Sequence, residues 1–391
     1  MKKNTSIELF TGAGGLALGL SKSGWHHLAL IEKNKHACYT IHMNESLKHS
    51  IAKNWKLYSE DVRDFKYNQI TDTVDMVAGG PPCQPFSLGG KHRAYRDNRD
   101  MFPEAVRAVR ELQPKCFLFE NVKGLLRQSF STYFNYIILQ LTYPTITRFN
   151  DEDWQKHLSR LECKHTGGML NELSYRVVFR LLNACDYGVP QNRHRVFIVG
   201  FRSDLGKEWS FPEPTHSLDR LLWDQWVDSS YWSEHEVSKK LQPQIPRQYK
   251  KRVERLLKDN KQPCGKRYKT VRDALFGLPD PICRYNTIIN HEFRDGARPY
   301  PGHTGSFFDS PSKALKAGAH GVPGGENMIM LPNGKYRYYT VRESARIQTF
   351  PDDYIFSGSW TEAMRQIGNA VPMKLATVVG ESIRKQMLKE S

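Results

Sequence analysis

Ile7-Glu8-Leu9-Phe10-Thr11-Gly12-Ala13-Gly14-Gly15 is the stretch that decides the fold. A short apolar strand ends there in a glycine-rich turn, and a helical pattern follows over residues 16–23. Glycines at such a turn let the backbone approach a ligand at the helix N-terminus. Residues 28–31 predict the second strand, and Glu32 follows it, where a carboxylate commonly holds the two hydroxyls of a ribose. This order favours a nucleoside cofactor, although a tight strand-to-helix turn needs glycine in any case.

Further strands are predicted outward from this start, at residues 74–77, 116–119, 175–182 and 195–199. Their alternation with helical segments predicts an α/β fold, a mostly parallel sheet with helices on both faces. Functional residues should then lie just past the carboxyl ends of the strands. The periodic pattern is lost after Phe201 and returns after Thr340, which predicts one domain of residues 1–201 and 336–391 and a second, smaller and irregular domain of residues 202–335.

The composition is that of an ordinary soluble protein, with 39% hydrophobic and 25% charged residues among 391. No apolar run reaches membrane-spanning length, and the first residues show no signal peptide, so we expect a cytoplasmic protein without a membrane partner. The seven cysteines are odd in number and form no Cys-x-x-Cys pair. This argues against a disulfide framework and against a ribbon-type zinc site.

The net charge of +16 is concentrated in one part of the chain. Residues 239–272 hold thirteen lysines and arginines but only two acidic residues, Glu254 and Asp259. Such clustering favours a surface that faces phosphates, and a nucleic acid is the first candidate for the partner. A general solubilising charge is the alternative.

Gly79-Gly80-Pro81-Pro82-Cys83-Gln84-Pro85-Phe86-Ser87 is the most unusual segment. Two prolines stiffen the chain before a cysteine that follows a strand, as a fixed sulfur nucleophile requires. Most single cysteines are inert core residues, but a loop of proline and glycine is a poor place for burial. The basic segment Lys91-His92-Arg93-Ala94-Tyr95-Arg96 follows and could close over a substrate.

Two further segments carry charged residues at strand ends. Glu120 follows the strand of residues 116–119 and is a candidate acid, with a helix cap as the alternative. Arg193 and Arg195 alternate at the start of a strand and should point to one face, where they could grip a carbonyl or a phosphate. A solvated strand edge is the ordinary explanation for such a pair.

Together these segments resemble the DNA cytosine-5 methyltransferase family, in the form found in bacterial restriction–modification systems. The resemblance covers residues 6–201 and 337–380, and six motifs stand in the family's order. They are Phe10-Thr11-Gly12-Ala13-Gly14-Gly15, Pro81-Pro82-Cys83-Gln84, Glu120-Asn121-Val122, Gln191-Asn192-Arg193-His194-Arg195, Arg342-Glu343-Ser344-Ala345-Arg346 with Gln348-Thr349-Phe350-Pro351, and Gly368-Asn369-Ala370-Val371-Pro372.

The resemblance implies transfer of a methyl group from S-adenosylmethionine to C5 of a flipped-out cytosine, through a covalent bond between Cys83 and C6 of the base. It implies that Glu120 binds N3, that Arg195 holds the base carbonyl, and that Arg193 supports it. The cofactor pocket that it implies contains no metal and is lined by Phe10, Gly12, Gly14, Gly15, Glu32, Asp61, Val62, Pro82, Asn369 and Val371. A solvated loop acid is the alternative for Asp61.

The resemblance further implies the Rossmann-like sheet of S-adenosylmethionine-dependent methyltransferases and a target-recognition domain at residues 202–335. The partner would be double-stranded DNA, and extruding a base from it costs a few kcal/mol, which phosphate contacts could offset. We expect a monomer, with any cognate restriction endonuclease acting separately. The DNA contacts that we predict are Gln84, Ser87, Lys91, Arg93, Arg96, Arg294 and Arg298. An ordinary polar surface is the equal alternative for Arg294 and Arg298.

Three alternatives stay open at this point. A tRNA cytosine-5 methyltransferase would share the fold, the cofactor and Cys83, but the basic variable region favours DNA, and the Cys-Phe-Thr signature of that branch is absent. A non-catalytic DNA-binding module would have no use for Cys83 and Glu120. An NAD-dependent oxidoreductase is disfavoured by the Gly-x-Gly-Gly pattern. Residues 151–165 indicate an added helix or loop without an assigned role.

Overall fold

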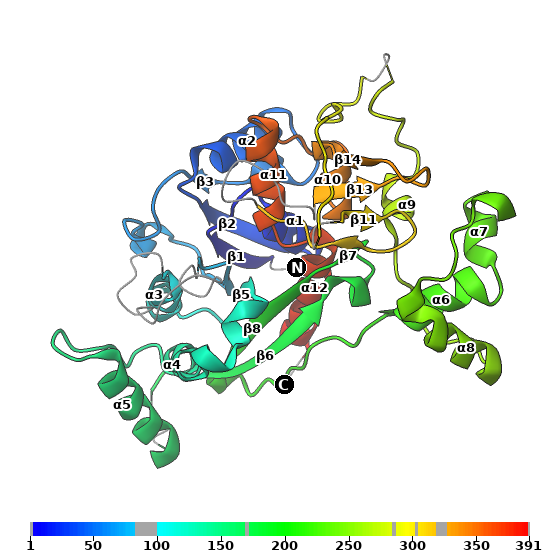
Figure 1. Cartoon of the computed structure of the whole chain (residues 1–391). Helices are drawn as coiled ribbons and strands as arrows, with labels where there is room; N and C mark the ends of the chain where they lie inside the picture. Colours follow the sequence, from blue (N-terminus) through cyan, green and yellow to red (C-terminus); the bar gives the residue numbers. More distant parts are fainter. Residues whose placement is uncertain are drawn as a thin grey trace. The chain divides into compact units, whose positions relative to one another are not determined.

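The computed structural model describes residues 3–82, 100–168, 172–283, 287–301, 304–317 and 327–389 (Figure 1). The chain packs as two compact units. Unit 1 consists of residues 1–182, 194–212 and 376–391, and unit 2 of residues 183–193 and 213–375. Residues 336–375 therefore count with unit 2, whereas the sequence grouped them with the first domain. The functions predicted for the two domains remain predictions.

Unit 1 is built on a seven-stranded sheet in the order β3-β2-β1-β4-β5-β8-β6 (Figure 1). Neighbouring strands from β3 to β5 run parallel, and β8 pairs antiparallel with β5. The strands are β1 Asn4–Leu9, β2 Trp25–Ile31, β3 Leu57–Tyr58, β4 Met76–Gly79, β5 Cys116–Val122, β6 Tyr175–Asn183 and β8 His194–Arg202. The helices of this unit are α1 Gly15–Lys22, α2 Lys35–Ser46, α3 Phe102–Leu112, α4 Ser131–Thr142, α5 Trp154–Gly167 and most of α12 Met373–Leu388.

Both faces of this sheet are covered by helices, because strand residues alternate between them. Ile7 and Leu9 belong to the core that also holds residues of α3 and α4. On the other face, the ring of His27 contacts the carbonyl of Ala17 in α1 at 3.0 Å, and the indole of Trp25 donates to the carbonyl of Gly380 in α12 at 3.1 Å. The predicted α/β sheet is confirmed, and the two late strands, β6 and β8, lie next to each other in it.

Unit 2 contains short helices and small sheets. The helices are α6 Leu218–Trp226, α7 Ser230–Glu234, α8 Lys250–Asp259, α9 Val271–Leu275, α10 Val341–Ile347 and α11 Trp360–Asn369. The strands are β7 Gln191–Asn192, β9 His216–Ser217, β10 Lys266–Arg267, β11 Ser306–Phe307, β12 Ser312–Lys313, β13 Met328–Met330 and β14 Tyr336–Tyr338. Four of the helices lie within residues 202–335, which is more regular structure than the sequence indicated. They are short, so no helical period is sustained.

Two small apolar clusters hold α6, α7 and α8 together. Leu222 and Trp223 of α6 pack with Val253 and Leu256 of α8, and Leu221 packs with the aromatic residues of α7. Within the described part of the chain, no helix combines the length and the apolar character needed to cross a lipid bilayer.

Candidate active site

The loop after β1 has a backbone that few residue types tolerate. The angle φ is positive at Phe10, Gly12 and Gly14, with values of 56°, 57° and 83°. Glycine adopts this left-handed region at no steric cost. A Cβ placed on Gly12 would meet no described atom within 4 Å, and Gly14 stands at the start of α1, where no described side chain caps the helix. The loop therefore offers backbone N–H groups that a ligand can approach closely.

Glu32 ties this loop to the end of β2. Its Oε2 accepts a hydrogen bond from the amide of Gly12 at 2.8 Å, and its Oε1 accepts one from the amide of Asn34 at 2.7 Å. Each carboxylate oxygen has a second lone pair with which to accept a hydroxyl. The structure thus brings the acid and the glycine loop together in unit 1. The binding of a ribose by Glu32 remains a prediction.

Asp61 lies beside this group in an ionised state. Its Oδ2 is 3.0 Å from Nζ of Lys33 and 2.7 Å from Nη2 of Arg63. The hydrogen bond from Arg63 is the main cause that lowers the pKa of Asp61. Val62 is buried, and its carbonyl accepts a hydrogen bond from Arg107 at 2.6 Å. A contact between Asp61 and an adenine remains a prediction.

Glu120 and Arg195 form a buried ion pair across β5 and β8. The antiparallel register pairs Glu120 with Phe197 and Val122 with Arg195, so the two charged side chains are diagonal neighbours on one face. Nε of Arg195 lies 2.8 Å from Oε1 of Glu120, and the side chains are 15% and 9% exposed. Burial lowers the pKa of Arg195, and the charge of Glu120 opposes this shift. The result is an oriented, largely desolvated acid and guanidinium.

The chain that leads toward Cys83 runs directly beside this pair. The amide of the Asn121 side chain donates to the carbonyl of Pro81 at 2.8 Å. A Cβ added to Gly80 would lie 3.5 Å from Oε2 of Glu120. The end of β4 and the end of β5 are therefore joined at the point where the Pro-Pro-Cys motif begins.

The residues on either side of the segment 83–99 are hydrogen bonded to each other. The carbonyl of Pro82 accepts from the amide of Met101 at 3.1 Å. Six predicted site residues lie in this segment, outside the described residues, and their roles remain predictions: Cys83, Gln84, Ser87, Lys91, Arg93 and Arg96.

Arg193 belongs to unit 2 and binds carbonyl groups of its own chain. Its guanidinium donates to the carbonyl oxygens of Leu315 at 2.9 Å, Gly368 at 2.7 Å and Ala370 at 3.1 Å. The residue is only 1% exposed. The described structure thus uses this guanidinium to bind main-chain carbonyls, two of them in the Gly368–Pro372 motif. The predicted grip on a carbonyl or phosphate in the cleft and the support of Arg195 remain predictions.

Two glutamines that the sequence analysis did not single out complete this support. Nε2 of Gln191 donates to Oε1 of Gln348 at 3.0 Å, and Nε2 of Gln348 donates to the carbonyl of Ile367 at 2.7 Å. Val371 is buried, whereas Asn369 is exposed at the end of α11. Both glutamines belong to the family motifs given above, and this membership is the sequence signal by which they could have been found. The cofactor contacts of Asn369 and Val371 remain predictions.

The predicted DNA contacts that the structure describes are Arg294 and Arg298 of unit 2. Both are exposed, and the guanidinium of Arg294 lies 5.4 Å from the centre of the Trp360 ring. A cation held over an indole keeps its charge and loses some freedom of orientation. Both arginines remain predictions as DNA contacts.

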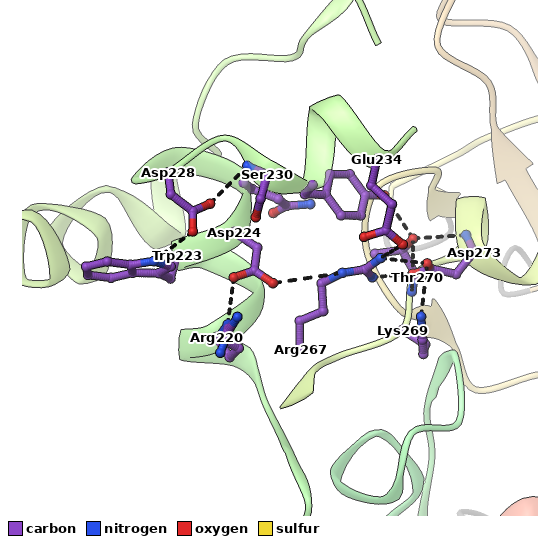
Figure 2. A network of polar contacts seen from close by, with 12 residues as sticks. Arg220, Trp223, Asp224, Asp228, Ser230, Glu234, Arg267, Lys269, Thr270 and Asp273 are labelled. Atoms are coloured by element: carbon purple, nitrogen blue, oxygen red, sulfur yellow. Dashed lines mark hydrogen bonds and ion pairs between the residues drawn. The ribbon is translucent and has the colours of Figure 1, made fainter. Parts of the chain in front are cut away.

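The basic stretch of residues 239–272 is partly neutralised by acids from outside it. Figure 2 shows Arg267 between Asp224 on one side and Glu234 and Asp273 on the other. Its guanidinium lies 2.7 Å from Asp273 and 2.8 Å from Glu234, and the side chain is 8% exposed. These acids hold the pKa of Arg267 above its usual range although burial opposes this. Arg267 thus links α6, α7 and α9 through its ion pairs with these acids.

Other arginines of the stretch are also ion-paired: Arg252 and Arg255 with Asp219, and Arg272 with Asp309. The lysines at the start of α8, in contrast, are not ion-paired in the described part of the chain. They are Lys250 and Lys251, and both are exposed. The surface available to phosphates is therefore smaller than the sequence count indicated.

One group of acidic and histidine side chains among the described residues is close enough to share a metal ion, namely Glu234, His235 and Asp273. Both carboxylates are already paired with Arg267, and Asp273 also lies 3.4 Å from Lys269. A divalent cation would have to displace these charges. We assign no metal to this group.

Comparison with known proteins completes the description. The family model of the C-5 cytosine-specific DNA methylase matches residues 4–143 and 152–385, and so leaves out residues just before α5. Type II methyltransferase M.NgoMIV of Neisseria gonorrhoeae is 31% identical over 99% of both chains. Type II methyltransferase M.Eco47II of Escherichia coli is 32% identical over 97% of this chain and 78% of its own.

Two solved structures share the fold. The S. pombe Dnmt2 methyltransferase aligns with a TM-score of 0.56 and 16% identity over 99% of this chain and 100% of its own. The Entamoeba histolytica methyltransferase EhMeth aligns with a TM-score of 0.55 and 15% identity over 100% of both chains. With the family model spanning nearly all of the sequence, the chain belongs to the C-5 cytosine-specific DNA methylase family.

Proposed function

We propose that this protein methylates C5 of a cytosine extruded from double-stranded DNA within a specific short sequence, with Cys83 as the nucleophile. S-adenosylmethionine is the cofactor of the family. The observation that carries the proposal is the buried Glu120–Arg195 pair, 2.8 Å apart, at the point where the chain enters the Pro-Pro-Cys motif. An acid and a guanidinium held where the chain leads into a cysteine motif suit addition to a pyrimidine ring.

The residues fit the cofactor at the end of β1. The open space at Gly12, the start of α1 that no described side chain caps, and the Glu32 carboxylate together suit a nucleoside with a charged tail. When bound, S-adenosylmethionine supplies an electrophilic methyl group on a sulfonium. The remaining chemistry belongs to the chain and the base.

The thiolate of Cys83 adds to C6, and the electron pair of the C5–C6 double bond becomes available at C5 for the incoming methyl group. Glu120 passes a proton to N3 as the negative charge of the addition develops, and takes this proton back when the thiolate leaves, while Arg195 holds the base carbonyl. The pair is preorganised because Arg195 already orients Glu120 in the described structure. After methylation, the C5 proton is lost to a base, and its electron pair re-forms the double bond and expels the thiolate.

The biological setting that we propose is a restriction–modification system in the cytoplasm of a bacterium. The support is that relatives matched along almost their whole length are Type II methyltransferases. The enzyme would act as a monomer, and a cognate endonuclease would act separately. Residues 202–335 would form the target-recognition domain, with Arg294 and Arg298 among its DNA contacts.

The first test uses duplexes that contain 5-fluorocytosine, incubated with the protein and S-adenosylmethionine. Fluorine at C5 does not leave as the proton does, so we expect a covalent complex that survives denaturation and maps to Cys83. Cys83→Ser is the control and should give no complex. A complex with tRNA and none with any DNA would support the RNA-modifying alternative. Full methylation activity in Cys83→Ala would overturn the mechanism.

A further inference from the structure

Glu8 is a buried acid for which the reaction has so far given no use. It lies in β1, where Ile7 and Leu9 point into the apolar core that contains α3 and α4. Ser6 and Glu8 alternate with them and point to the opposite face, which α1 covers (Figure 1). Glu8 is 1% exposed.

The surroundings of Glu8 do not compensate a negative charge. Its carboxyl accepts a hydrogen bond from the backbone of Ala17 in the first turn of α1. Its Oε2 has no hydrogen-bond partner among the described residues, and no described lysine or arginine is paired with it. Burying an uncompensated carboxylate is costly, so the neutral acid is favoured. Burial, with a further contribution from the charge of Glu32, accordingly raises the pKa of Glu8 well above its usual value.

Two titratable groups belong to the neighbouring strand β2 or follow it directly. His27 of β2 is neutral, since burial lowers its pKa to about 4, and it contacts Ser6 and Ala17. Glu32 follows β2 and binds the amide of Gly12. Glu32 is the charged group that acts on Glu8. Charged groups elsewhere on the neighbouring elements include Lys22 of α1, Asp75, which is paired with Lys115 and bonds to Thr5, and Arg384 beside Gly24.

The charge of the cofactor changes during the reaction. S-adenosylmethionine has a sulfonium, an ammonium and a carboxylate, and therefore carries one net positive charge. Its product has lost the sulfonium charge and is neutral overall. The loop that suits the cofactor continues directly from β1, so a cation held there would be close to the Glu8 and Glu32 carboxyls.

We propose that Glu8 is a charge-matching carboxyl of the cofactor site, neutral in the free protein and ionised in the complex with S-adenosylmethionine. The proton passes to solvent when the cationic cofactor binds. Glu8 takes a proton back after methyl transfer, when the sulfonium charge is gone, and the site then no longer favours the product. This inference rests on the assignment of S-adenosylmethionine as the cofactor.

The test is isothermal titration calorimetry of the whole protein without DNA, at pH 7.5 in phosphate, Hepes and Tris buffers. The dependence of the observed enthalpy on the ionisation enthalpy of the buffer gives the number of protons released. We expect release of up to one proton per S-adenosylmethionine bound, the limit for a single carboxyl, and almost none with S-adenosylhomocysteine. Affinity for the cofactor should rise with pH, while affinity for the product should not.

Glu8→Gln keeps the shape of the side chain and removes its proton. It should abolish the release and lower the preference for cofactor over product at least tenfold. The matched control is Glu381→Gln, an exposed glutamate on α12 that should behave as wild type. If Glu8→Gln fails to fold, the release of protons on binding of sinefungin to the wild type tests the inference instead. Its amine carries a positive charge in place of the sulfonium, so it should release a proton as the cofactor does.

Each unfavourable outcome has a separate meaning. If the wild type binds the cofactor without releasing a proton, the inference about Glu8 is overturned and the proposed function is not affected. Unchanged release in a folded Glu8→Gln would also overturn it and would point to Glu32. Failure of sinefungin to release a proton would exclude charge as the cause. Failure of S-adenosylmethionine to bind at all would overturn the proposed function together with the inference.

Discussion

Removing one residue of the Glu120–Arg195 pair should lower both the free energy of unfolding and kcat. The two atoms are 2.8 Å apart, and the side chains are 9% and 15% exposed. Loss of one partner of a buried pair costs about 3–5 kcal/mol, because the other charge stays buried without a partner. Arg195 keeps its hydrogen bond to the carbonyl of His194 at 2.8 Å. We therefore expect about 3 kcal/mol for Glu120→Ala and about 2 kcal/mol for Glu120→Gln, which keeps an acceptor.

A double-mutant cycle isolates the pair. Urea unfolding, followed by far-UV circular dichroism, would be measured for wild type, Glu120→Gln, Arg195→Met and the double variant without cofactor. We expect a coupling energy of about 1.5–3 kcal/mol, in the range for residues in direct contact. A coupling below about 0.5 kcal/mol would mean that the two residues act independently and would refute the argument.

Catalysis provides the second part of this prediction. Glu120→Gln should lower kcat by about 10²–10⁴-fold, the contribution typical of a positioned acid or base. Its affinity for DNA should change by less than about threefold, since the residue meets the base only after extrusion. A variant that loses DNA affinity and keeps kcat would show that Glu120 serves binding and not chemistry.

Four further predictions follow from individual side chains. Arg193→Met should lower the free energy of unfolding by about 3–5 kcal/mol, because two buried carbonyls and one part-buried carbonyl lose a charged donor, and a decrease under about 1 kcal/mol in urea titrations would contradict this. Folding raises the pKa of Glu8 above its usual 4.5, so its stabilising contribution is complete below pH 4.5 and is lost as the pH rises toward the folded pKa. Glu8→Gln should therefore gain stability over wild type by up to about 1.4 kcal/mol per pH unit above 4.5, and a gain that shrinks with pH would exclude a neutral Glu8. Replacing Lys250 and Lys251 with glutamine should flatten the salt dependence of DNA affinity by about 0.9 in the log–log slope for each phosphate that the variant no longer neutralises, and an unchanged slope would remove α8 from the DNA surface. Cys83→Ala should abolish turnover and keep DNA affinity within about threefold in filter-binding assays, and turnover in that variant would exclude the thiol as nucleophile.

The arrangement of the glycine loop and Glu32 could be predicted because it is local in sequence. Strand, glycine loop, helix, strand and Glu32 lie within the first 32 residues, and each step follows from apolar patterning and turn chemistry. The link between Gly12 and Glu32 then needs only two adjacent parallel strands. Glu8 was visible as an acid inside an apolar strand. Its lack of a charged partner among the described residues could be learned only from the packing of α1.

The partners of Glu120 could not be predicted, because they depend on a register. Arg195 follows Glu120 by 75 positions, and only the antiparallel alignment of β5 with β8 makes them neighbours. The same limit applies to Arg193. Its alternation with Arg195 predicted a shared face, but the two residues fall in different units, and the carbonyls that Arg193 binds come from residues 315–370. Pairings of this kind are set by tertiary structure.

The basic stretch shows why a charge count along the chain differs from a charged surface. Residues 239–272 contain only two acids, yet Arg267 and Arg272 are paired with Asp273 and Asp309, which lie beyond that window. Phosphates release counterions only from cations that are free to meet them, so buried arginines contribute nothing to salt-dependent affinity. Substitution at Arg267 should therefore act on folding, and substitution at Lys250 on DNA affinity. The two kinds of basic residue can be separated by measuring unfolding and salt dependence on the same variants.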